Sequence, residues 1–504
     1  MSLSNPRTSR PKALPIALLA ACLVVLAAVT SGSFWIDEGG SVFKAMQPTL
    51  TDWWQAMRWE RNSNMQLPLY LVVLWGWQKV FGSGEMAIRL ANGPFFLLTI
   101  WGLWVAFRAQ AARFAFAVLF LLTNAFAWFY LNEARPYTLL LAGSTLLFAA
   151  VYRLKEEPDG LGQQWAWVFT AAALLVCATS MIAVPWAACA FCAAWHVRGR
   201  NFPLEFVRRF PLAFACLALG MAGLGGYYVW SLKSGADVPS MGKTGWLNLG
   251  FVAYELFGFA GLGPGRNVMR VEFLQAFKGF YGPLAVYGTL WTAALAWVIW
   301  LRARLASRRT IVFYLILLVP IVLVMLAGYG HGVRILPRYL TPALPLVIGL
   351  GSYLAAQLWP RGAVARCLVA GLCLVALASA LEIRLAPRHA KDDYRSAVNA
   401  AKKAAAQGTT VFWAADVQTA VCYGLIQQKQ IDSGSQEVVL YSTPGAQQEL
   451  PSSALVVLSK VDIYDPAGAI REFLRRNGYT LTDVFQSFQL WRRPGTAPAA
   501  LPAR

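Results

Sequence analysis

The sequence has little charge for its length. Only 13% of its 504 residues are charged, whereas 58% are hydrophobic, and Asp and Glu together number 24. A soluble enzyme of this size needs a larger polar surface. The composition therefore excludes that class and predicts an α-helical polytopic membrane protein.

Signals for disulfides, metals and phosphate loops are also missing. Seven of the eight cysteines lie within apolar runs, and the three histidines are scattered along the chain. The "GLGPGR" stretch at 261–266 has glycines but neither a preceding strand nor the Lys-Ser/Thr ending of a phosphate loop. We expect no disulfide framework, no metal site and no cofactor.

The net charge of +20 has a different meaning here than in a soluble protein. Its basic residues lie in short clusters between apolar runs, which is typical of topology signals and lipid headgroup contacts. We therefore expect membrane lipids, and not nucleic acid, as partners.

Apolar stretches long enough to cross a bilayer fill residues 1–385. Nine of them lie at 13–33, 87–107, 114–132, 136–152, 211–231, 281–301, 311–329, 340–358 and 364–383. A further stretch, 166–196, exceeds the roughly 20 residues that one crossing needs and has Thr179, Ser180 and Pro185 near its middle. We interpret it as two short helices, which gives about eleven crossings, the first of them an uncleaved helix.

Basic residues predict the orientation. Arg7, Arg10 and Lys12 place the N-terminus in the cytoplasm, and the other basic clusters then fall on the same side. The segments 34–86, 232–280 and everything after about 383 face outwards. We expect a multi-pass protein of the bacterial cytoplasmic (inner) membrane with an amphipathic first external loop at 34–86.

The segment 386–504 is more polar and predicts a small extracytoplasmic, periplasmic α/β domain. Its helices are expected at 394–407, 417–427 and 466–477, and its strands at 410–414, 438–441, 454–459 and within 480–491. The Pro- and Ala-rich end is predicted to be disordered.

Asp37 and Glu38 directly follow the first apolar run, on the predicted outer side. By position alone they fit a solvated loop better than a site, although charge near a membrane is costly and often functional. The same loop interleaves tryptophans with Arg58, Arg61 and Lys79, a pattern that suits the headgroup layer. Each tryptophan taken singly also fits a structural aromatic belt.

Two outer turns add further ionisable groups. "NEARPY" carries Glu133 and Arg135, and "HGVRILPRYL" carries Arg334 and Arg338. The first turn also fits a helix end with a local ion pair, but outward arginines run against the topological bias and are candidates for binding phosphate. The set suits a reaction in which an acid takes a proton from an acceptor and arginine neutralises a leaving phosphate.

The motifs carry a family resemblance. In order, "FWIDEGGSVF", "NMQLPLYLVVLWGWQKVFGSGEMAIRLANGPFFLLTIWGLW", "NEARPYTLLLA", "PRYLTPALPLVIGLGSYL" and "KDDYRSAVNAA" resemble the bacterial GT-C glycosyltransferases. These belong to the superfamily of protein O-mannosyltransferases and the aminoarabinose transferase of lipid A, and are glycosyltransferase family 39-like. The resemblance implies a GT-C fold.

It also implies an activity, namely inverting transfer of a sugar from a polyprenyl-phosphate donor at the outer face of the membrane. The acceptor would be a protein, a lipid such as lipopolysaccharide, or a cell-envelope glycan. Asp37 corresponds to the catalytic acid of the family and Glu38 to its neighbouring acid, so both are predicted catalytic residues, Asp37 as the general base and Glu38 to position Asp37 or the sugar. The remaining predicted residues are Arg135, Arg334 and Arg338 for the donor phosphate, and Gln66, Tyr70, Glu133, Tyr137 and Tyr339 for positioning the substrate.

The chain departs from the family at two places. It has Gln66 and Leu67 where relatives often have His-Pro or an acid, and "TSMIAVPW" where they often have His-Tyr. Two rival functions stay open, a polyprenyl-lipid transporter or flippase and a non-catalytic lipid-binding relative. A transporter predicts paired broken helices in two repeated halves, and the sequence has no such internal symmetry.

Overall fold

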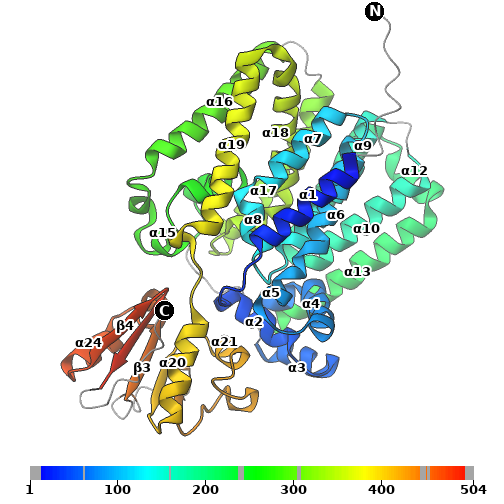
Figure 1. The fold of residues 1–504 in the computed structure, drawn as a ribbon. Coiled ribbons are helices and arrows are strands. Elements are labelled where there is room, and N and C mark those ends of the chain that lie inside the picture. The colour runs from blue at the N-terminus through cyan, green and yellow to red at the C-terminus, as the bar shows by residue number, and fades with distance from the viewer. Residues whose placement is uncertain are drawn as a thin grey trace, which may run out of the picture.

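The protein, analysed as a computed structural model, combines a large helical bundle with a smaller α/β unit at its C-terminal end (Figure 1). The structure describes residues 13–60, 63–157, 161–235, 243–302, 308–442, 450 and 454–493. The N-terminal Arg7, Arg10 and Lys12 and the Pro- and Ala-rich end beyond 493 lie outside the described residues.

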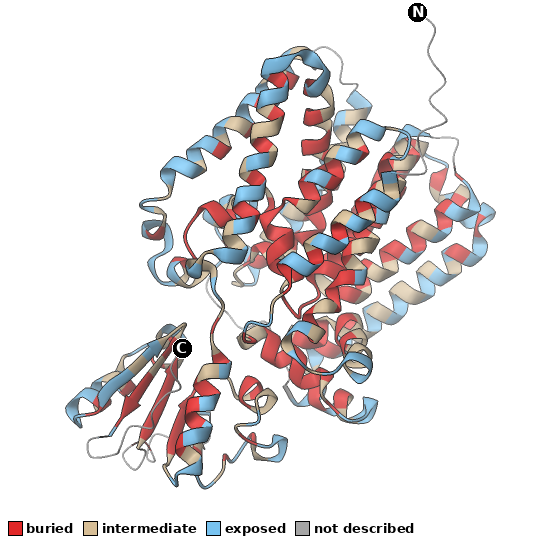
Figure 2. Cartoon of the chain, viewed as in Figure 1, coloured by how far each residue is buried: buried red, intermediate tan, exposed pale blue. Residues whose placement is uncertain are grey.

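The bundle consists mainly of long apolar helices. They are α1 (Ala13–Ala28), α6 (Asn92–Phe107), α7 (Ala111–Leu122), α8 (Ala125–Leu131), α9 (Tyr137–Glu156), α10 (Gln163–Thr179), α11 (Val184–Arg198), α13 (Pro211–Lys233), α16 (Tyr281–Arg302), α17 (Arg308–Gly330), α18 (Leu344–Leu358) and α19 (Ala363–Leu385). Helix α9 is almost wholly buried, whereas α13 and α17 expose leucines and other apolar side chains (Figure 2). Apolar residues all around a helix are expected where the surroundings are protein on one side and lipid on the other.

Within the described residues, eight helices are long and apolar enough to cross a membrane, or up to nine if the bent pair α7 and α8 forms one span. The sequence suggested about eleven, and the difference lies in α1 and α10, which have 16 and 17 residues. Both are shorter than the roughly 20 residues of a full crossing. The stretch 166–196 does form two helices, with the break at Ser180 and η2 (Met181–Ala183).

The apolar stretch 114–132 is not one straight helix as its composition suggested. Helices α7 and α8 meet at an angle of 58°. Asn124 lies at the break in an extended conformation, and its side-chain oxygen accepts a hydrogen bond from the Ala127 amide (3.1 Å). This N-cap starts a new helix where hydropathy alone predicts a continuous one.

The segment between α1 and α6 folds onto the end of the bundle that faces the α/β unit (Figure 1). It contains α2 (Ile36–Ala45), α3 (Leu50–Glu60), η1 (Ser63–Gln66), α4 (Pro68–Phe81) and α5 (Glu85–Leu90). The remaining connections hold α12 (Phe202–Arg209), α14 (Trp246–Leu256), η3 (Ala260–Leu262), α15 (Arg266–Glu272), η4 (Phe273–Phe277), η5 (Pro337–Ala343), η6 (Trp359–Arg361) and η7 (Pro387–His389).

The C-terminal unit is built around a mixed sheet with the strand order β2-β1-β3-β5-β4. Its described elements are α20 (Tyr394–Ala406), β1 (Val411–Ala414), α21 (Val417–Cys422), η8 (Gln428–Gln430), β2 (Val438–Leu440), β3 (Leu455–Ser459), α23 (Val461–Tyr464), α24 (Ala469–Arg476), β4 (Thr480–Phe485) and β5 (Phe488–Arg492). Strand β1 runs parallel to β2 and β3, whereas β5 pairs antiparallel with β3 and β4. Strands β1 and β3 are buried along their whole length, as unbroken apolar runs predict.

Helices α2 and α21 join the two parts of the chain at a close contact. A Cβ atom at Gly39 would lie 1.8 Å from Thr419 Oγ1 and 2.8 Å from Thr419 Cβ. The Cys422 thiol also approaches the Gly39 carbonyl at 3.6 Å. Only a residue without a side chain permits this approach.

We expect Gly39→Ala to force α2 and α21 apart and to lower the free energy of unfolding by about 1–3 kcal/mol, the usual cost of overpacking. Denaturant unfolding of the purified protein in detergent measures this loss. The matched control is Gly76→Ala in α4, where no heavy atom lies within 4 Å of the added carbon. Equal stability of the two variants would show that the contact does not hold the parts together.

Candidate functional site

Asp37 lies in the first turn of α2 and pairs with an arginine from a distant part of the chain. Its Oδ2 atom is 2.5 Å from Nη1 of Arg338, which η5 provides. The two residues are 301 positions apart, so only the fold brings them together. The Asp37 side chain is 28% exposed and that of Arg338 16%, which leaves the pair accessible from one side.

The surroundings of Asp37 favour its ionised form. Burial alone would raise the pKa of this carboxyl, but the charges of Arg338, then Arg135, then Lys460 outweigh it and lower the pKa to about 2. The carboxylate is therefore charged at neutral pH. While the Arg338 contact persists, it is a poor proton acceptor.

Arg135 fixes the loop around Asp37. Its Nη1 atom donates hydrogen bonds to Asn64 Oδ1 (3.0 Å), Ser41 Oγ (3.2 Å) and the backbone carbonyl of Asp37 (3.3 Å). These partners belong to α2 and η1. Arg135 therefore connects the turn before α9 to the two short elements that surround the acid.

A cavity of about 270 Å³ lies beside the Asp37 and Arg338 pair. Seven of the ten predicted site residues line it: Asp37, Gln66, Arg135, Tyr137, Arg334, Arg338 and Tyr339. They come from α2, η1, the start of α9 and the segment that leads into η5. Two further lining residues, Asp416 and Gln418, come from the C-terminal unit.

Glu38 points away from this cavity. Its carboxylate is fully buried and binds the Arg89 guanidinium through Nε (2.8 Å) and Nη2 (2.7 Å), and it accepts the Ala134 amide (2.9 Å). Burial would raise the pKa of Glu38, but Arg89 and then Lys391 lower it. The fold thus gives the two neighbouring acids different surroundings. The sequence suggested that Glu38 is catalytic, but its carboxylate contacts Arg89 and the Ala134 amide and does not reach the cavity.

Tyr70 and Glu133 also lie outside the cavity lining. The Tyr70 hydroxyl is buried against Asn92 Oδ1 (3.4 Å). Glu133 is fully buried, and among the described residues neither of its carboxylate oxygens has a hydrogen-bond partner. Burial raises its pKa to about 7 in spite of Lys391, whose Nζ is 3.7 Å away. Neither side chain can touch a ligand in the Asp37 cavity in this conformation.

Several residues of this region were not singled out from the sequence. Arg89 begins an apolar run, where a basic residue resembles an ordinary helix boundary. Lys391, Asp416 and Gln418 belong to the C-terminal unit, and their approach to the bundle is a long-range contact. Two of the motifs that carry the family resemblance include Arg89, within "EMAIRL", and Lys391, at the start of "KDDYR". No motif marks Asp416 or Gln418.

Nowhere in the described ranges do three or more His, Cys, Asp or Glu side chains gather closely enough to hold a metal ion. The expectation of a metal-independent site stays a prediction. The cavity lining offers the Asp37 carboxylate, three arginines and two tyrosines, together with Asp416, whose carboxylate accepts hydrogen bonds from Thr419.

We expect Glu38→Gln to destabilise the protein, because it leaves the buried Arg89 guanidinium without its counter-ion. Breaking a buried pair in this way costs about 3–5 kcal/mol. Denaturant unfolding in detergent measures the effect. Glu472→Gln, which breaks the exposed pair with Arg476, is the control and should cost no more than about 1 kcal/mol. A similar small loss in both variants would contradict the structural role of Glu38.

Comparison with solved structures identifies the architecture. The crystal structure of ArnT from Cupriavidus metallidurans in the apo state matches with a TM-score of 0.51 at 14% identity, over 95% of this chain and 97% of that chain. The structure of the same protein bound to undecaprenyl phosphate matches with a TM-score of 0.52 at 14% identity, over 96% of this chain and 99% of that chain. No protein-family model and no curated protein matches the sequence.

These likenesses extend over nearly the whole of both chains, including the C-terminal unit. An identity of 14% speaks for shared architecture and not for shared substrates. The prediction from the motifs is thereby confirmed at the level of the fold: the chain has the ArnT-like GT-C fold of a polytopic membrane protein with a small C-terminal sheet domain.

Proposed function

We propose that the protein transfers a glycosyl group from a polyprenyl-phosphate-linked donor to an acceptor at the outer face of the membrane. The observation that carries this proposal is the Asp37 and Arg338 ion pair, open to a cavity that Arg135 and Arg334 also line. The fold supports it, because one of the similar ArnT structures is bound to undecaprenyl phosphate.

Arg338 and Arg334 are the proposed ligands of the donor phosphate. A guanidinium group donates two parallel hydrogen bonds to phosphate oxygens, which suits a diester whose charge grows as the sugar leaves. Arg135 has three protein acceptors on Nη1, so we assign it mainly to holding Asp37 and to adding positive charge. Tyr137 and Tyr339 line the same cavity and offer hydroxyl groups to the sugar.

Donor binding would change the state of Asp37. The phosphate competes with the carboxylate for Arg338, so occupancy of the cavity weakens the ion pair. The pKa of Asp37 then rises from about 2 towards the value that burial favours. The carboxylate thereby becomes a stronger base only when the donor is in place.

The proposed reaction is a single displacement. Asp37 accepts the proton of the acceptor hydroxyl or amine, and the acceptor atom forms a bond to the anomeric carbon of the sugar. The bond between this carbon and the phosphate oxygen breaks, and its electron pair leaves with the polyprenyl phosphate. Attack from the side opposite the leaving group inverts the anomeric configuration.

Glu38 enters this proposal as a positioning residue. It keeps the first turn of α2 attached to Arg89 and to the Ala134 amide. Its neighbour Asp37 therefore faces the cavity whether or not a substrate is bound. The proposed acceptor is a protein, a lipid or a cell-envelope glycan.

Substitution of Asp37 tests the activity itself. In proteoliposomes supplied with radiolabelled undecaprenyl-phosphate sugars and a membrane extract as acceptor, Asp37→Asn should lower the transfer rate by about 100- to 10,000-fold, since the base is lost. The control is Asp52→Asn, which changes the carboxylate that bonds Thr49 at the start of α3, outside the cavity. Transfer at the wild-type rate by Asp37→Asn would remove this residue from catalysis. If the wild type moves the donor across the membrane but transfers no sugar, the protein is a transporter and not a transferase.

The pH profile tests the ion pair. Arg338→Gln removes the main charge that opposes burial, so the pKa of Asp37 should rise. Because the ionised carboxylate is the active form, the acidic limb of kcat/KM should move to higher pH than in the wild type. The KM for the donor should also rise by about tenfold or more through loss of a charged hydrogen bond.

Arg334→Gln provides the matched comparison for this measurement. Arg334 lines the same cavity, but Arg338, Arg135 and Lys460 are the charges that lower the pKa of Asp37. For Arg334→Gln we expect a higher KM for the donor, and we expect the acidic limb of its kcat/KM profile to lie at the same pH as in the wild type. Identical pH profiles for Arg338→Gln and the wild type would show that Asp37 does not titrate in the rate-determining chemistry.

A further inference from the structure

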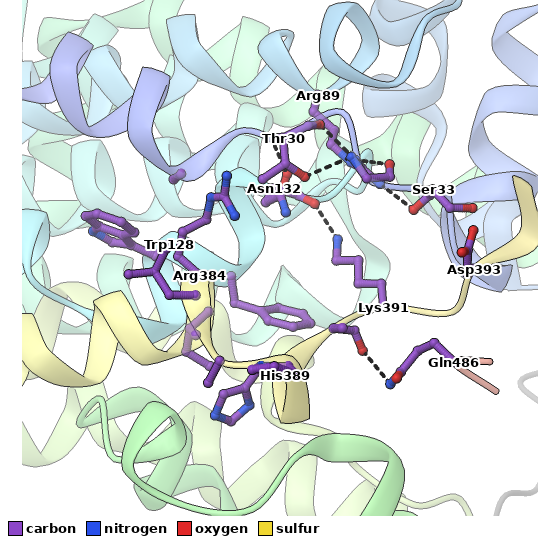
Figure 3. Close-up of a pocket in the computed structure, with 18 of the residues that line it drawn as sticks. Thr30, Ser33, Arg89, Trp128, Asn132, Arg384, His389, Lys391, Asp393 and Gln486 are labelled. Atoms are coloured by element: carbon purple, nitrogen blue, oxygen red, sulfur yellow. Dashed lines mark hydrogen bonds between the residues drawn. The ribbon is translucent and has the colours of Figure 1, made fainter. Parts of the chain in front are cut away.

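A second cavity lies where the chain leaves α19 and crosses to the C-terminal unit (Figure 3). It has a volume of about 360 Å³ and shares no lining residue with the Asp37 cavity. Its walls are the end of α1, the end of α8, the last turn of α19 and the linker 386–393. We call it the linker cavity.

Among the charged side chains that line the linker cavity, cations outnumber carboxylates. Four are cations, namely Arg89, Arg384, Lys391 and Arg395, against the single carboxylate of Asp393. That carboxylate is already engaged, because it caps α20 through the Ser396 amide (3.1 Å) and hydroxyl (2.6 Å). Arg89 is committed to Glu38, and Arg395 pairs with Glu85 at 3.2 Å.

Arg384 is the cation that keeps hydrogen-bonding capacity for a ligand, and Lys391 adds positive charge beside it. Arg384 donates Nε to the Ala27 carbonyl (3.1 Å), which ties α19 to α1, and neither Nη atom has a partner among the described residues. Lys391 extends from the linker towards the Asn132 carbonyl (Figure 3). Its Nζ atom also lies 3.5 Å from Glu38 and 3.7 Å from Glu133, so it contributes charge to the cavity more than free donors. The Asn132 side-chain oxygen accepts the Thr30 amide (2.9 Å), so its NH₂ group is a further donor at this wall.

Another part of the lining is apolar or aromatic. Trp128, Phe129, Ile383 and Leu385 form this part of the wall. Beyond the cavity both flanking helices expose leucines along their length: Leu19, Leu23 and Leu26 on α1 and Leu374, Leu377, Leu381 and Leu385 on α19. Cations and Trp at the end of lipid-exposed apolar helices are the surroundings that phospholipid headgroups occupy.

We propose that the linker cavity binds the phosphate of an anionic lipid headgroup through Arg384, with the charge of Lys391 beside it and the acyl chains against α1 and α19. A free phosphate ion offers the same charge but no chains for the apolar wall. The bound lipid would hold the linker between the bundle and the C-terminal unit. This site is separate from the proposed catalytic cavity and does not depend on the proposed reaction.

The test uses the full-length, delipidated protein in detergent and three probes: short-chain phosphatidic acid, diacylglycerol with the same chains, and inorganic phosphate. We expect phosphatidic acid to bind more tightly than either of the others. Arg384→Gln should weaken its binding by about tenfold or more, the value of a charged hydrogen bond. Arg384→Lys should restore part of the affinity. The control is Arg476→Gln in α24, which loses the same charge at a surface position.

Equal affinity of the wild type and Arg384→Gln for phosphatidic acid would overturn the proposal. Equal affinity for inorganic phosphate and phosphatidic acid would overturn its lipid part and assign the cavity to a free anion. Arg338→Gln changes only the Asp37 cavity. If that variant binds phosphatidic acid more weakly than the wild type while Arg384→Gln binds it equally well, the lipid occupies the Asp37 cavity and not the linker cavity. Because Arg384 is exposed, unfolding midpoints in detergent should be unchanged, which separates lost binding from lost folding.

Discussion

The structure around the candidate site depends on one buried ion pair, Glu38 with Arg89. Both side chains are inaccessible to solvent, and Arg89 also binds the backbone carbonyls of Thr30, Gly32 and Ser33. Glu38 in turn accepts the Ala134 amide. The end of α1, the start of α2 and the turn before α9 therefore meet at one point. A buried pair adds little net stability, since desolvation opposes its attraction, but it is costly to break. The pair instead fixes the positions of the segments that it joins. Asp37 is adjacent to Glu38 in the chain and Arg135 is adjacent to Ala134, so both are held in place by these contacts.

This arrangement explains how two adjacent acids can have different roles. Along a helix, neighbouring residues point about 100° apart, so one faces the protein and the other can face a cavity. Glu38 has a permanent cation of its own, enclosed on all sides. The cation that pairs with Asp37, Arg338, lines the cavity, where in the proposed reaction the donor phosphate competes for it. The difference between the two carboxylates is thus one of access, because both are paired with arginine.

The sequence predicted those parts of the molecule that local patterns determine. Apolar runs located the helices, the change in composition located the sheet unit, and motif residues such as Arg338 and Tyr339 do line the cavity with Asp37. Most of the failures have long-range causes, and one has a local cause that hydropathy misses. The partner of Glu38 is 51 residues away, Glu133 is buried where a surface turn was expected, and the bend between α7 and α8 depends on one capping Asn124 that hydropathy does not register. The C-terminal wall of the cavity could not be read from the sequence, because nothing local links 416–418 to α2.

That C-terminal wall has its own attachment. The Tyr423 hydroxyl accepts the Phe34 amide (2.8 Å) and donates to Glu85 (3.0 Å), and α21 packs directly on α2 at Gly39. These contacts hold Asp416 and Gln418 at the cavity without using Asp37 or Arg338. Changes in these two side chains can therefore reshape the wall that a substrate meets while the ion pair stays intact. If the proposed reaction takes place in this cavity, the bundle and its first loop would carry the chemistry, and the C-terminal unit would form part of the surface that the acceptor meets.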